Sequence, residues 1–234
     1  MKRLLAICIL SLTISPAFAQ LIVGWSGGYG SPQELNRVVY IYNAVNRQGL
    51  KKEMQPVHWN QGLAVGARVG GELFFELLYT RKVARVHSEF DSTTVPMERQ
   101  MKVMSNTWNF AMGYQDDRFA LGLSFDIGRF KGWGRRGPTS TIGDMEYMKL
   151  WVVDNTKLLG IHAYKLYTSL TAFAEIKFGF IAVRGYFQYA LGRNQMEWLD
   201  TWLLGNMINY TEYEQDKYSN VGLMVSFQLG PGHK

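Results

Sequence analysis

The chain has 234 residues, a formal net charge of +6 and a single cysteine, Cys8. Cys8 falls inside an expected export leader, so the mature chain would contain no cysteine, which excludes disulfides, thiol catalysis and cysteine-ligated metals. No later apolar run approaches the ~18–20 residues that a membrane-spanning helix needs.

The first residues are typical of a secretory signal. Lys2 and Arg3 form a positive n-region, 4–14 is a short apolar run, and Ala17-Phe18-Ala19 is an A-x-A cleavage site. We expect residues 1–19 to be the signal peptide and 20–234 to be one domain. Nucleic acid is not an expected partner of an exported chain, despite the basic balance. A soluble exported protein and an outer-membrane barrel both remain open at this point.

The clearest structural signal lies at 119–127, where large apolar residues alternate with small or polar ones. This two-residue period is that of a β-strand. The apolar register then continues as Arg129, Lys131, Trp133 and Arg135. A strand whose outer face passes from hydrocarbon into the headgroup layer has this pattern, and its apolar part matches the ~9–11 residues of a tilted spanning strand.

The rest of the chain predicts a further series of strands and one helix. A strand at 21–29 is followed by a helix, for which Ser31, Pro32 and Glu34 predict a capping box and whose apolar stripe should pack on the adjacent strand ends. Six more strands are expected at 61–69, 73–90, 102–114, 170–178, 181–191 and 219–229, which with 119–127 makes eight. The connections alternate between long and tight, as in bacterial outer-membrane barrels. The long segments 130–167 and 194–216 would be extracellular.

Charged residues recur at one end of the outward registers. Arg or Lys is expected at the upper interface on five strands, at Arg81, Lys102, Arg129, Arg193 and Lys217, with Lys131 and Arg135 above. Bound lipopolysaccharide phosphate would explain such a belt, because Arg suits bidentate phosphate contact. Snorkelling of long cationic side chains at any membrane interface also explains it and is the favoured interpretation.

Taken together, these patterns resemble the small eight-stranded outer-membrane β-barrel proteins of Gram-negative bacteria, the OmpA/OmpX-like barrel family. The resemblance covers the whole mature chain. It implies an all-β, eight-stranded antiparallel up-and-down transmembrane β-barrel in the cell outer membrane, with long extracellular loops and one short loop helix. Asn220, Gly222, Val225 and Phe227 look like the last-strand signal of such barrels, which implies recognition by the barrel-assembly machinery. The chain departs from the pattern by continuing to Lys234.

The lumen of such a barrel is just wide enough to be filled by side chains. The inward registers carry several charges, at Glu76, Lys82, Asp126, Glu175, Lys177 and Arg184. If Gly179-Phe180 is a two-residue turn, Glu175 faces Arg184 and forms a charge-assisted pair. We therefore expect an ion-paired plug.

Evidence for catalysis is thin. The candidates are His58, His87, Ser88, Glu89 and His162, but His87 and Ser88 are adjacent in a strand and point to opposite faces. No nucleophile, base and orienting group share a useful spacing, and no cofactor or metal site is expected. The favoured function is a non-enzymatic, monomeric outer-membrane protein with a structural or surface-interaction role through its loops, in contact with membrane lipid and lipopolysaccharide. An outer-leaflet lipid A-modifying enzyme is the alternative, and a passive pore is a third.

Overall fold

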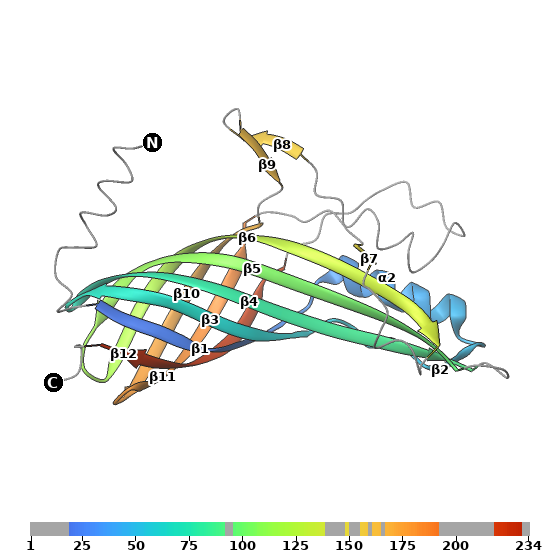
Figure 1. Cartoon of the computed structure of the whole chain (residues 1–234), viewed down its shortest axis with the longest axis horizontal. Helices are drawn as coiled ribbons and strands as arrows, with labels where there is room; N and C mark the ends of the chain where they lie inside the picture. Colours follow the sequence, from blue (N-terminus) through green and yellow to red (C-terminus); the bar gives the residue numbers. More distant parts are fainter. Residues whose placement is uncertain are drawn as a thin grey trace.

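The computed structural model describes residues 19–91, 96–138, 148–149, 155–158, 161–164, 167–191 and 218–230 (Figure 1). Its long strands are β1 (Ala19–Gly30), β3 (Trp59–Gly70), β4 (Leu73–Phe90), β5 (Met97–Gln115), β6 (Phe119–Pro138), β10 (Tyr167–Phe178), β11 (Ile181–Ala190) and β12 (Asn220–Leu229). Helix α2 (Gln33–Asn46) and the short strands β2 (Leu50–Lys52), β7 (Met148–Lys149), β8 (Asn155–Leu158) and β9 (Ile161–Tyr164) complete the described elements.

The long strands close on themselves. Each pairs antiparallel with its neighbour, β12 pairs with β1, and β6 pairs with β10, so that the described residues form a ring of 8 strands. The predicted fold class is confirmed. The expected cleavage after Ala19 stays a prediction, because 1–18 lie outside the described residues; Ala19 itself pairs with Val69 at the start of β1.

The ring is apolar outside and polar inside. Leu123 is 65% exposed and Ile176 is 56% exposed, whereas Arg68 and Glu175 are each 1% exposed. A soluble barrel would hold the opposite arrangement, because exposed contiguous apolar surface is costly in water. This distribution is that of a transmembrane β-barrel.

Three neighbouring strands continue beyond the ring. β4, β5 and β6 have 18, 19 and 20 residues, about twice the ~9–11 that cross a bilayer. Their upper parts, Val83–Phe90, Met97–Met104 and Lys131–Pro138, stay in register with one another. We call this three-stranded extension the blade; Figure 1 shows it running past the other strands toward α2.

The inner face of these strands changes character where the blade begins. Within the ring, β4 points Glu76, Thr80 and Lys82 inward, whereas in the blade the same register carries Ala84 and Val86. The outer face changes in the opposite sense, from Leu77 and Tyr79 to Arg81 and Arg85. Both changes occur at one level, which marks where the strands leave hydrocarbon.

Helix α2 covers the apolar inner face of the blade. Leu35, Val39 and Tyr42 pack with Ala84, Met101 and Val103 in one buried cluster. The expected packing of the helix on adjacent strand ends is therefore present. The expected capping box is wrong: the helix begins at Gln33 and the N-cap position is Pro32, which has extended ψ and no side-chain cap. Ser31 lies one residue too early to cap and is instead 3.5 Å from Asn36 Nδ2.

Two asparagines bind α2 to the segment that returns to the barrel. Asn36 donates to the Val57 carbonyl at 3.2 Å and accepts from its N–H at 2.8 Å. Asn43 makes the same pair of bonds with Met54, at 2.8 and 3.0 Å. Seven residues are about two helical turns, so both amides lie on one face. The two asparagine side chains bond backbone groups of the segment 53–58 that a neighbouring strand would otherwise bond. These bonds hold the segment on the helix.

A tyrosine packs over a glycine where β11 meets β12. Gly222 lies opposite Tyr186, and a Cβ on Gly222 would overlap the Tyr186 ring. The Tyr186 hydroxyl donates to the Gly27 carbonyl at 2.9 Å on β1. A side chain at Gly222 would therefore disturb three strands. Gly185, on the outer face of β11, has open space around it, with only Leu223 at 3.9 Å.

We predict that Gly222→Ala destabilises the folded barrel by roughly 1–3 kcal/mol, the usual cost of overpacking. Gly185→Ala, the matched control, should change stability much less. The measurement is urea unfolding in detergent or lipid, followed by tryptophan fluorescence. Equal midpoints for the two variants would contradict the role of the Tyr186 contact.

Candidate functional site

Four charged side chains meet in the lumen, toward the end of the barrel that carries the tight turns. The Arg68 guanidinium contacts Glu76 at 2.7 Å and Glu175 at 2.8 Å. The Arg184 guanidinium contacts the same two carboxylates at 2.6 and 2.7 Å. Two cations and two anions thus alternate in a closed quartet whose formal charges cancel. It joins β3 and β4 to β10 and β11 across the barrel.

Sequence reasoning found only part of this quartet. Glu175 lies directly opposite Arg184, as the two-residue turn at Gly179-Phe180 predicts. Arg68 was missed, although the outward alternation of Leu63, Val65, Ala67 and Val69 leaves it on the inward face. The alternation along β3 was therefore enough to predict that Arg68 points into the lumen. Its partners did not follow from spacing, because Arg68 and Glu175 are far apart in the chain.

Neutral groups and aromatic rings complete the surroundings of the quartet. Gln228 donates to Glu175 at 2.8 Å, and Arg68 donates to Gln115 at 3.1 Å. The guanidinium carbons lie 4.4 Å from the Phe74 ring centroid for Arg68 and 4.1 Å from that of Phe173 for Arg184. These contacts place an aromatic ring against each guanidinium group and use much of the remaining hydrogen-bonding capacity of the charges.

Asp126 forms a second polar layer above the quartet. Its carboxylate accepts from the hydroxyls of Ser124 at 2.6 Å, Ser169 at 3.0 Å and Thr171 at 2.5 Å. It also accepts from the Gln188 amide at 2.9 Å. These partners are all neutral, so this fully buried charge is held by converging hydroxyl and amide dipoles.

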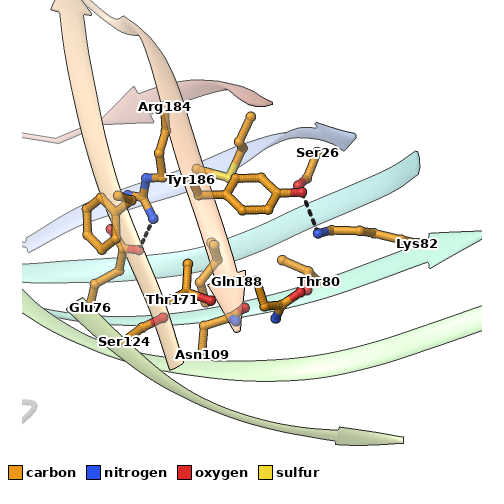
Figure 2. Close-up of a pocket in the computed structure, with 13 residues that line it drawn as sticks. Ser26, Glu76, Thr80, Lys82, Asn109, Ser124, Thr171, Arg184, Tyr186 and Gln188 are labelled. Carbon is orange, nitrogen blue, oxygen red and sulfur yellow. Dashed lines mark hydrogen bonds and ion pairs between the residues drawn. The ribbon is translucent and has the colours of Figure 1, made fainter. Parts of the chain in front are cut away.

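A small cavity separates the two layers. Figure 2 shows Lys82 reaching toward Tyr186, and Arg184 toward Glu76, at its margin. Lys82 Nζ donates to the Tyr186 hydroxyl at 2.7 Å. The cavity volume is about 40 Å³, and one water needs roughly 10–15 Å³ by this measure. The space suits a few waters.

The predicted headgroup belt is described on one side of the barrel. Arg81, Asn106 and Arg129 lie in one row across β4, β5 and β6, and Arg85, Lys102 and Trp133 lie in a row above it. Lys131 falls between the rows and Arg135 above them. Arg193 and Lys217 lie outside the described residues. The described members therefore form an outer cationic face of the blade and of the strand segments just below it.

The residues of the predicted assembly signal divide between the two faces of β12. Asn220 is buried toward the lumen and Gly222 follows on that face, whereas Val225 and Phe227 are exposed on the outer face. Their recognition by the assembly machinery stays a prediction.

Among the described catalytic candidates, His87 lies 3.8 Å from Glu89, but no candidate nucleophile joins this pair. Ser88 is buried with its Oγ 2.8 Å from the Tyr42 hydroxyl, while His87 lies on the opposite face and accepts from Lys52 at 2.7 Å. Burial raises the pKa of Tyr42, against the opposing effects of Ser88 and Arg99. His58 stacks on Tyr29 at 5.3 Å. The side chain of His162 lies outside the described part.

Two features are absent from the described residues. These residues contain no group of three His, Cys, Asp or Glu side chains placed to hold a metal ion. Neither do they contain a helix of sufficient length and apolar character to cross a membrane.

The closed ring, charged lumen and apolar exterior define a small eight-stranded transmembrane β-barrel. No protein-family model matches the chain, and no curated protein matches its sequence. Two solved structures of Ail, the attachment invasion locus protein of Yersinia pestis, are similar at 8% identity, with TM-scores of 0.42 and 0.40. In the first, Ail is in complex with the heparin analogue sucrose octasulfate. Each comparison covers 90% of this chain and 97% of the Ail chain.

We predict that Glu175→Ala destabilises the barrel by about 3–5 kcal/mol, because it leaves buried arginine charge without compensation. The melting temperature in detergent should fall accordingly. Glu72→Ala, a carboxylate removal in the tight turn between β3 and β4, is the control and should have little effect. An unchanged melting temperature for Glu175→Ala would rule out an energetically important quartet.

Proposed function

We propose that the protein is a non-enzymatic, monomeric integral protein of the outer membrane, which anchors the blade at the cell surface for contact with other surfaces or envelope partners. The observation that carries the proposal is the paired reversal of the two strand faces. The outer face turns from apolar to cationic at the level where the inner face turns from charged to apolar. A bilayer edge at that level accounts for both changes.

The arrangement of the connections supports one orientation. Tight turns at Gly70-Gly71, Asp116 to Arg118 and Gly179-Phe180 gather at one end, and the blade and α2 lie at the other. Outer-membrane barrels place short turns in the periplasm and long connections outside. In this orientation the blade projects from the cell.

The blade is built to hold a fixed shape. Its inner face is sealed by α2, and α2 is bound in turn by Asn36 and Asn43. The Tyr42 hydroxyl lies 2.8 Å from Ser88 Oγ on β4. A rigid support for exposed polar residues is a common design for interaction surfaces. These contacts favour a surface-interaction role over a mobile catalytic lid.

We predict heat-modifiable migration of the membrane-fraction protein on SDS gels. The closed hydrogen-bonded ring should resist SDS at room temperature and migrate faster than the boiled chain. Gel analysis of fractionated cells is the measurement. Recovery in the soluble periplasmic fraction with a single band would contradict the proposed placement.

Lipid A of unchanged mass after gene deletion would support the non-enzymatic role, whereas an altered mass would favour the lipid A-modifying alternative.

We predict no stable conductance from the purified barrel in planar bilayers, because the quartet and the Asp126 layer fill the lumen. A general porin in the same bilayers is the positive control. Regular channel steps from this protein at neutral pH would instead favour a passive pore.

A further inference from the structure

A notch lies at the base of the blade, where the pairing of β3 with β4 ends. Their pairing ends at Gln61 and Val83, and β4 next pairs with β2 at Lys52 and Glu89. Among the described strands, none pairs with 84–88 on this side. The intervening segment 53–58 is held away by its bonds to α2. The notch has a volume of about 520 Å³, which is within the usual size of ligand pockets.

The lining of the notch is half polar or aromatic and half aliphatic. His58, Trp59 and Gln61 line one side, and Val83 and Arg85 line the other. The Arg85 side chain is exposed at the outer face and lies in the row of Lys102. The notch therefore opens beside the cationic face.

Positive side chains outnumber negative ones on the cationic face. Outward positions from Arg81 to His87 on β4, and their row partners on β5 and β6, include no carboxylate; acidic residues return only at Glu89 and Glu98. Burial lowers the pKa of Lys102, and the nearby charges of Arg85, Arg81 and Arg135 lower it further. Crowded cations of this kind favour binding of an anion.

The level of the notch follows from strand length and aromatic residues. The 12 residues of β3 are close to the ~9–11 needed to span, so Trp59 at its upper end reaches the interface. Tyr79 and Trp108 contact each other at 5.0 Å directly below Arg81. Aromatic side chains mark the boundary between hydrocarbon and headgroups. The notch and the cationic face thus lie at headgroup level.

We propose that the notch, with Arg85 in its lining and Arg81 just below it on β4, binds the phosphate headgroup of an anionic outer-leaflet lipid. This rests on the outer-membrane placement proposed above. The guanidinium groups supply forked donors that match phosphate oxygens. The polar lining receives the rest of the headgroup, and the apolar band below contacts the acyl chains. If the cations only snorkelled to the membrane interface, filling the notch would not affect lipid binding.

The test uses the full barrel in nanodiscs of zwitterionic lipid, titrated with diphosphoryl lipid A and followed by native mass spectrometry. The double variant Arg81→Gln/Arg85→Gln should raise the half-saturating lipid A concentration at least about tenfold, as expected for lost charge-assisted hydrogen bonds. Arg118→Gln, the same charge change in an exposed turn at the opposite end, should leave it unchanged. Val83→Phe should weaken binding by filling the notch without altering charge.

Three results with the variants would overturn the proposal, and a fourth, with inorganic phosphate, would overturn its lipid assignment. The three are unchanged binding in the double variant, an equal loss in Arg118→Gln, and full binding in a folded Val83→Phe protein. If Val83→Phe loses its heat-modifiable band, Gln55→Trp replaces it as the notch-filling variant. Displacement of lipid A by millimolar inorganic phosphate would assign the site to a soluble anion and overturn the lipid assignment. Heat-modifiable migration of each variant separates failed binding from failure of the outer-membrane proposal.

Discussion

The quartet of Arg68, Glu76, Arg184 and Glu175 is the interaction on which the barrel depends. A charge transferred alone from water to a low-dielectric interior costs far more than a folded domain can offset. Here each arginine contacts both carboxylates, and each carboxylate contacts both arginines. These mutual contacts compensate the charges on four strands at once. They therefore favour the one strand register that brings the four side chains together. Polar groups can fill the lumen because of this compensation, and apolar groups are then left for the membrane-facing surface.

Beyond the membrane the same strands face the opposite problem. Water now surrounds the outer face, so a polar outer face and an apolar inner face are the stable arrangement. The blade has no opposing barrel wall to cover that inner face, and α2 takes its place. The helix is therefore needed because three strands are longer than the other five and expose an apolar inner face above the ring. Its fixation by Asn36 and Asn43 has a second effect, because it draws the segment 53–58 away from β4 and leaves the notch.

The cationic face and the notch have one structural origin. Long adjacent strands bring Arg81, Arg85 and Lys131 together in neighbouring rows, and the missing strand partner opens a pocket beside them. The notch depends on this difference in strand length, and so does the part of the cationic face that lies on the blade. In the proposed function the blade is a rigid surface for contact outside the cell, and in the proposed lipid site the notch at its base binds a headgroup phosphate.

The sequence by itself determined the strands, their faces and the opposition of Glu175 to Arg184, because a two-residue period and a tight turn are local properties. It also contained the inward position of Arg68, which follows from the same period. Only the tertiary structure decided that Arg68 meets Glu175, that neutral hydroxyls hold Asp126, and that the described belt cations form one face. The structure also shows that the helix begins at Gln33, later than the start predicted from a Ser31 cap. These outcomes depend on ring closure and on unequal strand lengths, which bring together residues from distant parts of the chain.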